Sequence, residues 1–283
     1  MENERTVRDL GTLTGPVLVF GGIYSNLPAL EKLRELAQSW GIGRENIICT
    51  GDVVGYCGDP DAVARMMEQW GVSTIAGNVE IQMREGLDEC GCSFAEGSRC
   101  DALSQEWYPF AQLNTSPEAL AWMGTLPAHL RFRYAGREVL VVHGSWHETA
   151  EYVFASTPDT VLQRNFTDAG AEVILAGHCG LPFARELNGR HWLNAGVIGM
   201  PANDGTTRVW CLLLDDAGGF SGKYRSFTYD HFRAAARMRT QGLPEAYALT
   251  LETGIWDNMD ILPEAERQLQ GQAITLDPMS VSP

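Results

Sequence analysis

The sequence predicts an α/β fold in which short apolar strands first alternate with helices and later pair through hairpins. Three observations lead to this prediction: apolar runs about as long as buried strands, helical patterns between the first of these runs, and turn signals between the later ones. Strands that alternate with helices form right-handed crossovers and neighbouring, largely parallel strands. The chain has 283 residues, which suits one large domain over residues 1–283.

The first part of the chain follows this alternation in order. After a polar N-terminal arm we expect a strand over 17–20, a helix over 27–40, a strand over 46–50, a helix over 61–70 and a strand over 72–76. Pro60 and Asp61 are start signals for the second helix. In such an arrangement ligands gather beyond the carboxyl ends of the strands.

The second part of the chain predicts helices and then hairpins. Residues 81–130 lack strand periodicity and contain helical stretches, so we expect a helical insertion or lid there. Strands over 131–134, 138–142, 183–187, 191–193, 207–214 and 223–229 are expected to complete a second, antiparallel or mixed sheet. Helices are expected within 230–265, the first capped by Asp230, and the tail over 272–283 is expected to be mobile.

Charge and composition narrow the class of protein. Lys plus Arg is 21 and Asp plus Glu is 36, so the net charge of −15 opposes attraction of nucleic acid or anionic membranes, and neither is an expected partner. No apolar run approaches membrane-spanning length and no secretory signal is visible, so we expect a cytoplasmic location. The sequence is compatible with a homo-oligomer but does not specify one.

Four polar side chains follow four of the apolar runs. Asp52, Asn78 and His178 each come after a glycine at the end of a run, and His143 follows its run directly. Such a set of oxygen and nitrogen ligands suits Mn, Fe or Zn better than Ca or Mg. Because the ends of neighbouring strands can meet at one point, the set indicates a metal-assisted hydrolase. Turn or capping residues without a metal are the alternative.

Longer motifs surround these residues. They are Asn26-Leu27-Pro28-Ala29-Leu30, Gly51-Asp52-Val53-Val54-Gly55-Tyr56, Gly77-Asn78, His143-Gly144, Gly177-His178 and Asn194-Ala195-Gly196-Val197-Ile198-Gly199. Over residues 17–215 this ordered set resembles the calcineurin-like metallophosphoesterases. The resemblance implies a two-layer β-sandwich flanked by helices and two metals that activate a hydroxide against a phosphate ester. It also implies that Asp52 bridges the metals, with Asn78, His143 and His178 completing the second subsite.

The same resemblance implies that the first metal subsite is degenerate. Where the family has Asp-x-His this chain has Gly22-Ile23-Tyr24, and where it has Gly-His-x-His this chain has Gly177-His178-Cys179-Gly180. Asp52 alone would remain, and one carboxylate cannot hold a dication tightly. We therefore expect one divalent transition metal (Mn, Fe or Zn) and no second metal.

Further roles follow from the resemblance. Val79 stands where the family has a His that protonates the leaving oxygen, a contribution of about 10²–10⁴-fold, so good leaving groups would suffer least. Asn26 would position the phosphate, and Tyr24 would enter the vacated subsite as catalyst or plug. Glu80 would steady a ligand from outside the metal shell. His147 could replace the missing imidazole.

Two functions from different classes follow. The first is hydrolysis of a small phosphomonoester, phosphodiester or dinucleotide-type substrate through one metal-bound hydroxide, with Asp52, Asn78 and His143 as the catalytic set. The alternative is a catalytically weak or inactive pseudophosphatase that acts as a binding or regulatory protein. A third hypothesis, a thiol-dependent enzyme, would use Cys57 or Cys179.

The remaining cysteines offer no familiar metal motif. Cys90-Gly91-Cys92 with Cys100 lacks the paired spacing of common zinc modules, and free thiols in the insertion are expected.

Overall fold

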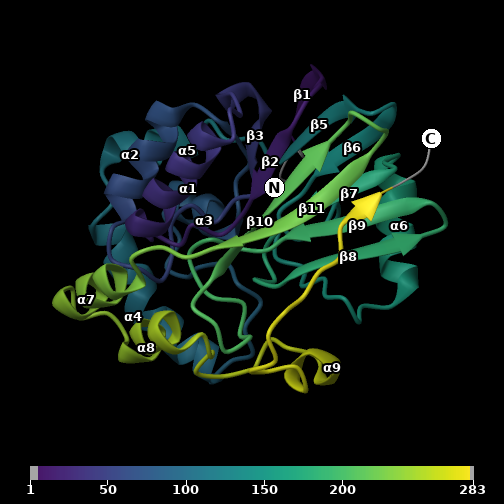
Figure 1. Cartoon of the computed structure of the whole chain (residues 1–283). Coiled ribbons are helices and arrows are strands. Elements are labelled where there is room, and N and C mark those ends of the chain that lie inside the picture. The colour runs from purple at the N-terminus through teal and green to yellow at the C-terminus, as the bar shows by residue number, and fades with distance from the viewer. Residues whose placement is uncertain (1–5, 281–283) are drawn as a thin grey trace.

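Two six-stranded sheets form the centre of the computed structural model, which describes residues 6–280 (Figure 1). One sheet has the strand order β12-β11-β10-β2-β3-β4 and the other β1-β5-β6-β7-β9-β8. The strands are β1 (Val7–Thr12), β2 (Val17–Phe20), β3 (Ile47–Cys49), β4 (Ser73–Thr74), β5 (His129–Tyr134), β6 (Arg137–Val141), β7 (Val173–Ala176), β8 (Pro182–Leu187), β9 (Arg190–Ala195), β10 (Val209–Asp215), β11 (Ser221–Phe227) and β12 (Met279–Ser280). One hydrophobic cluster draws side chains from both sheets, so the two pack face to face as the predicted two-layer sandwich.

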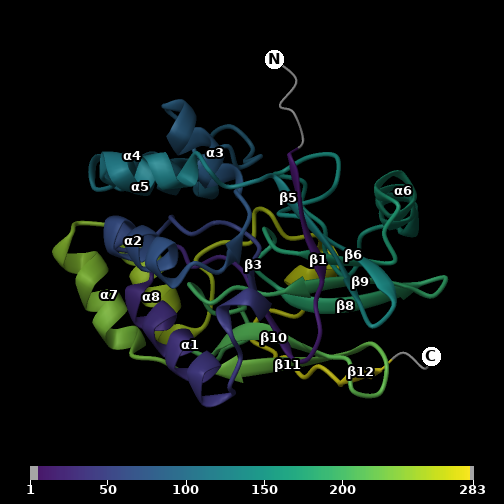
Figure 2. The ribbon, with the colours of Figure 1, turned by 90° about the horizontal axis from the view of Figure 1, so that it is seen from above.

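Helices cover the outer faces of both sheets (Figure 2). They are α1 (Leu27–Ser39), α2 (Pro60–Trp70), α3 (Asn78–Glu85), α4 (Arg99–Leu113), α5 (Pro117–Met123), α6 (Asp159–Ala169), α7 (His231–Thr240), α8 (Glu245–Thr253) and α9 (Glu264–Arg267). Helices α1, α2, α7 and α8 share a second cluster with the β10-β2-β3 side of the first sheet. Helix α6 packs on the outer face of the second sheet.

The central strands are apolar throughout because both of their faces are buried. In β2, Val17 and Val19 enter the cluster between the sheets, whereas Leu18 and Phe20 pack against the helices. All four side chains have zero solvent exposure. Side chains alternate between the two faces of a strand, so a strand covered on both faces has no place for a polar residue.

The parallel part of the fold agrees with the prediction. Strands β2, β3 and β4 are parallel neighbours, and helices α1 and α2 connect them. The expected strands and helices of the insertion and of the C-terminal region are also present, with ends shifted by a few residues.

Four expectations about the strands and the tail were wrong or incomplete. Strands β10 and β11 do not complete the second sheet: β10 pairs with β2 in the first sheet instead. The tail was expected to be mobile, but β12 pairs with β11, and residues 281–283 lie outside the described residues. The polar N-terminal arm contains β1, which pairs in parallel with β5. Helix α6, which connects β6 to β7, was not predicted.

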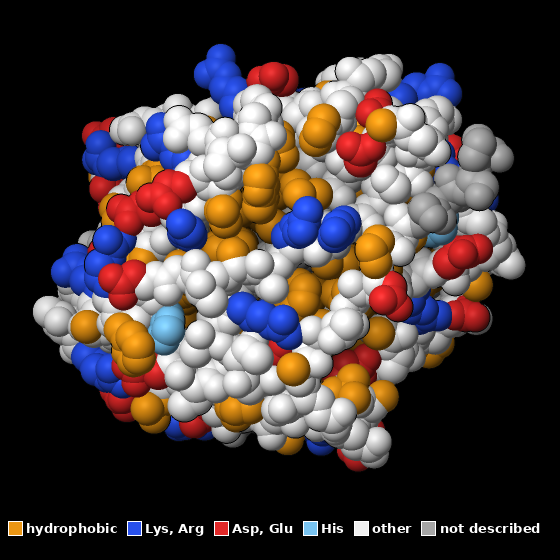
Figure 3. All heavy atoms as spheres, viewed as in Figure 1, with side chains coloured by type: hydrophobic (Ala, Val, Ile, Leu, Met, Phe, Trp, Pro, Cys, Tyr) orange, Lys and Arg blue, Asp and Glu red, His pale blue; other side chains and the backbone are white. Residues whose placement is uncertain are grey.

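The expected helical insertion is part of the packed structure. Trp107 and Tyr108 of α4 are 1% exposed and belong to the same cluster as the helices on the first sheet. Among the described residues, no helix is both long and apolar enough to span a membrane. On the face seen in Figure 3, acidic and basic side chains are interspersed and hydrophobic side chains gather near the middle.

Candidate metal centre

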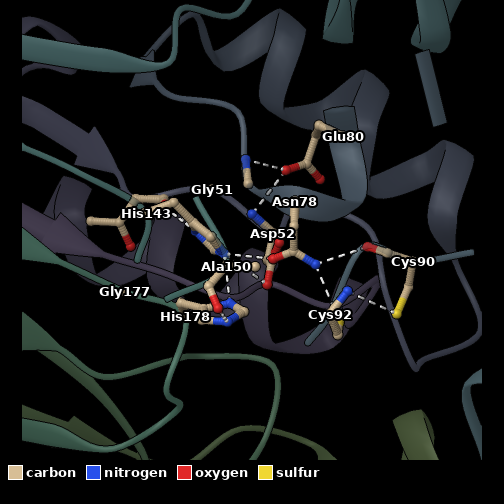
Figure 4. Close-up of polar contacts among 12 residues, drawn as sticks. Gly51, Asp52, Asn78, Glu80, Cys90, Cys92, His143, Ala150, Gly177 and His178 are labelled. Atoms are coloured by element: carbon tan, nitrogen blue, oxygen red, sulfur yellow. Dashed lines mark hydrogen bonds and ion pairs between the residues drawn. The ribbon is translucent and has the colours of Figure 1, made fainter. Parts of the chain in front are cut away.

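The four predicted ligand side chains meet at one edge of the sandwich. Asp52 follows β3 and Asn78 begins α3 after β4, while His143 follows β6 and His178 follows β7. Each sheet therefore contributes two of them, and their polar atoms point toward one another (Figure 4). The four residues are between 1% and 7% exposed.

Hydrogen bonds to backbone carbonyls fix the tautomers of the two histidines. His143 Nδ1 lies 2.6 Å from the carbonyl oxygen of Thr50, and His178 Nε2 lies 3.1 Å from that of Ala150. A carbonyl oxygen only accepts, so both of these ring nitrogens donate. The other nitrogen of each neutral ring, Nε2 of His143 and Nδ1 of His178, is left with a lone pair that faces the cluster.

The lone-pair atoms crowd around His143. Its Nε2 atom lies 3.1 Å from His178 Nδ1 and 3.1 Å from Asn78 Oδ1. The same atom lies 3.2 Å from Asp52 Oδ2, and Asp52 Oδ1 is buried without a hydrogen-bond partner. A single proton can satisfy only one of these contacts, whereas a cation satisfies all four atoms together. The donor set therefore fits a divalent transition metal.

Charge coupling within the cluster agrees with this geometry. Without a metal, burial raises the pKa of Asp52, but the charge and hydrogen bond of a His143 ring protonated at Nε2 outweigh burial and hold that pKa below its usual value. Asp52 in turn outweighs burial and raises the pKa of His143, and a bound metal would take the place of that proton. Burial and the neighbouring His143 together lower the pKa of His178 to about 3. His178 therefore remains neutral, which is the form that binds metals.

Backbone strain marks the turns that present these side chains. Asp52 and His178 have positive φ angles of 53° and 62°, which are unusual for residues other than glycine. A Cβ at Gly77 would overlap the Asp52 carboxylate, and one at Gly51 would lie 2.9 Å from His143 Nδ1. Both glycines are therefore needed for the close approach of the loops.

Glu80 holds two of these loops together from behind (Figure 4). Its carboxylate accepts hydrogen bonds from the backbone N–H groups of Asp52 at 2.9 Å, Val54 at 3.1 Å and Gly77 at 2.8 Å. Burial and the Asp52 charge raise the pKa of Glu80 to about 7, and the amides of Val54 and Gly77 oppose that rise. Glu80 therefore ties together the loops that carry Asp52 and Asn78.

The insertion orients the Asn78 amide. Asn78 Nδ2 donates to the carbonyl oxygen of Cys90 at 2.9 Å and to Cys92 Sγ at 3.2 Å. These contacts leave Asn78 Oδ1 facing His143, and they give the Cys90-Gly91-Cys92 segment a role that the sequence did not suggest.

Comparison with known proteins supports the same family. A family model described as the calcineurin-like phosphoesterase superfamily domain matches residues 18–217. The chain belongs to this superfamily. An uncharacterized protein of Methanocaldococcus jannaschii is 24% identical over 248 residues, covering 81% of this chain and 94% of that protein.

Two solved structures share the fold of this calcineurin-like chain. A metallophosphoesterase from Sphaerobacter thermophilus aligns with a TM-score of 0.68 and 21% identity, covering 86% of this chain and 100% of that one. A hypothetical protein from Pyrococcus horikoshii OT3 aligns with a TM-score of 0.70 and 19% identity, covering 85% of this chain and 99% of that one.

Aromatic rings occupy the space beside Gly22 and Gly180. A Cβ on Gly22 would overlap Val197 and lie 2.7 Å from Cζ of Tyr24. A Cβ on Gly180 would lie 3.2 Å from two ring carbons of Trp256. Ligand side chains at these two positions would therefore collide with their present neighbours.

Asn26 and His147 take positions different from those expected. Asn26 caps α1 through Oδ1, and its Nδ2 donates to the Gly199 carbonyl at 2.9 Å and to the Tyr229 hydroxyl at 2.8 Å. Its amide is fully engaged, so we assign it to the architecture of the loops and not to phosphate binding. His147 Nε2 lies 3.2 Å from Asp168 Oδ2, and His147 does not line the cavity beside the cluster. Tyr24, the other residue considered as a replacement for the missing acid, does line that cavity.

Sequence reasoning missed several residues of this site. Tyr152 stacks on His178 at 4.3 Å between ring centroids, and Tyr247 and Trp256 reach the cavity from the C-terminal region. They carry no motif, so no sequence signal identified them. The thiol hypothesis loses support because burial raises the pKa of Cys179 to about 12 and also raises that of Cys57, which leaves both thiols protonated.

Proposed function

We propose that this chain is a metal-dependent phosphoesterase that hydrolyses a small phosphoester with one bound divalent transition metal, Mn, Fe or Zn. Asp52, Asn78, His143 and His178 would hold the ion. The convergence of three lone-pair atoms on Nε2 of His143, each within 3.1–3.2 Å, is the observation that supports this most directly.

The bound metal would lower the pKa of water and polarise a phosphoryl oxygen. The protein's own contribution is positioning. Carbonyl groups hold the two histidine rings, the Cys90–Cys92 segment holds the Asn78 amide, and Glu80 holds the loops that present Asp52 and Asn78. Such contacts from outside the ligand set orient the ligands and tune their affinity.

One metal, and no second, is part of the proposal. The rings of Tyr24 and Trp256 lie beside Gly22 and Gly180, where side chains of a further subsite would need space. Val79 supplies no proton to a leaving group, so substrates that release a weakly basic oxygen are expected to react fastest.

Metal content and hydrolysis test this function. We expect about one Mn, Fe or Zn per chain by elemental analysis, and Mn-stimulated hydrolysis of p-nitrophenyl phosphate, its bis-ester or dinucleotide polyphosphates. Asp52→Asn should abolish activity and lower the metal content, whereas Asp88→Asn, at an exposed loop position, serves as the control. A metal-free, inactive wild-type protein would favour the binding protein instead.

A further inference from the structure

An aromatic cavity opens directly beside the metal centre. Its volume is about 90 Å³, and its mouth opens to solvent. Asp52 and His178 line it, together with residues of the insertion, of the C-terminal region and of other loops around the cluster. Its aromatic wall is formed by Tyr24, Tyr56, Tyr152, Tyr247 and Trp256.

The tyrosine rings form a continuous surface that begins at the candidate ligands. Tyr152 stacks on His178 with an interplanar angle of 25°. Tyr56 meets Tyr24 at 4.7 Å and Tyr247 at 4.9 Å, both edge to face. A planar group bound in the cavity would therefore contact ring faces and edges within reach of a phosphate at the metal centre.

The tyrosine hydroxyls are available to a ligand. Within residues 6–280, those of Tyr24, Tyr56, Tyr152 and Tyr247 make no hydrogen bond. None of these hydroxyl oxygens is among the buried polar atoms without a partner, so they are accessible from the open cavity. Burial raises the pKa of all four phenols, so they remain neutral donors.

Among the residues described, the absence of basic side chains from the cavity lining limits the negative charge that a substrate can carry. No lysine or arginine among the described residues lines the cavity. The nearby Arg99 is paired with Asp257, with Nε 2.7 Å from Oδ2. A polyphosphate chain with several negative charges would meet no cation beyond the metal, whereas the single charge of a phosphodiester matches one metal ion.

On the basis of the proposed function, we propose that this cavity binds the planar aromatic ester group that stays on the phosphate of a monoanionic phosphodiester substrate while the other ester group leaves. The aromatic group, an aryl ring or a nucleobase, packs against the rings of Tyr24 and Trp256, which themselves fill the space beside Gly22 and Gly180.

Substrates that share the same leaving group but differ in the other ester group test this inference. We compare p-nitrophenyl phenyl phosphate, thymidine 5′-(p-nitrophenyl phosphate) and p-nitrophenyl ethyl phosphate, all of which release p-nitrophenolate. The better aromatic diester should exceed the ethyl diester in kcat/KM by about tenfold, as expected from ring stacking and burial. Which aromatic ester is better distinguishes an aryl from a nucleobase substrate. Equal values for all three diesters would overturn the inference.

Variants locate the preference in the cavity. Tyr247→Ala should reduce the aromatic preference to about twofold or less. Phe232→Ala is the matched control, because Phe232 is 64% exposed on α7 and does not line the cavity. An unchanged preference in Tyr247→Ala would also overturn the inference.

Binding without turnover separates this inference from the proposed function. Saturation-transfer NMR with the full chain in EDTA compares diphenyl phosphate with diethyl phosphate. We expect transfer to the aromatic ligand in wild type, at least about twofold stronger than in Tyr247→Ala. Aromatic binding in a protein without hydrolytic activity would refute only the proposed function. If the protein hydrolyses the diesters without an aromatic preference and shows no saturation transfer to diphenyl phosphate, only the proposal that the cavity binds the aromatic group is refuted.

Discussion

Replacing Gly22 by Ala tests whether the space beside it is filled. Gly22 has a φ of +43°, and the added Cβ would overlap Val197 and lie 2.7 Å from the Tyr24 ring. The left-handed backbone destabilises alanine by about 1–2 kcal/mol, and the overlap adds about 1–3 kcal/mol. We therefore expect Gly22→Ala to lower the free energy of unfolding by about 2–5 kcal/mol in total.

Gly41→Ala is the matched control for backbone strain alone. Gly41 has a φ of +68°, and a Cβ there would meet nothing within 4 Å. It should lower the unfolding free energy by only about 1–2 kcal/mol. Urea unfolding followed by circular dichroism measures both variants. Equal losses, within about 0.5 kcal/mol, would show that Val197 and the Tyr24 ring move away freely and that the space can be reopened.

Three further predictions follow from the site. Gly22→Asp should leave the metal content at about one ion per chain, because the carboxylate has no room; two bound ions by elemental analysis would contradict this. Cys92→Ala should weaken metal binding about tenfold in a competition titration by loosening Asn78, whereas buried Cys211→Ala should leave affinity unchanged. Removal of metal by EDTA should lower the calorimetric unfolding temperature, since a ligand at 100 times its Kd stabilises by about 2.7 kcal/mol, and an unchanged temperature would argue against a native site.

The strands and the candidate ligands were predictable because their signals are local. Val17–Phe20 is apolar at every position, and Asp52 and His178 follow glycines directly after such runs. A run of consecutive apolar residues indicates that both faces of a strand are buried, and the glycine that follows indicates a sharp turn. Which sheet strands β10 and β11 join could not be predicted from the sequence, because the pairing of strands that are distant in sequence depends on how the whole chain folds.

The sequence by itself determined the superfamily, the alternation of strands and helices from β2 to β4, and the four side chains that gather at strand ends. Only the tertiary structure decided what surrounds them. It placed Tyr152, Tyr247 and Trp256 around the cluster, set Cys92 behind Asn78 and turned Asn26 into a cap. The reason is physical: a ligand at a strand end is specified by its own turn, whereas a cavity wall is assembled from segments that meet only after the sheets have packed.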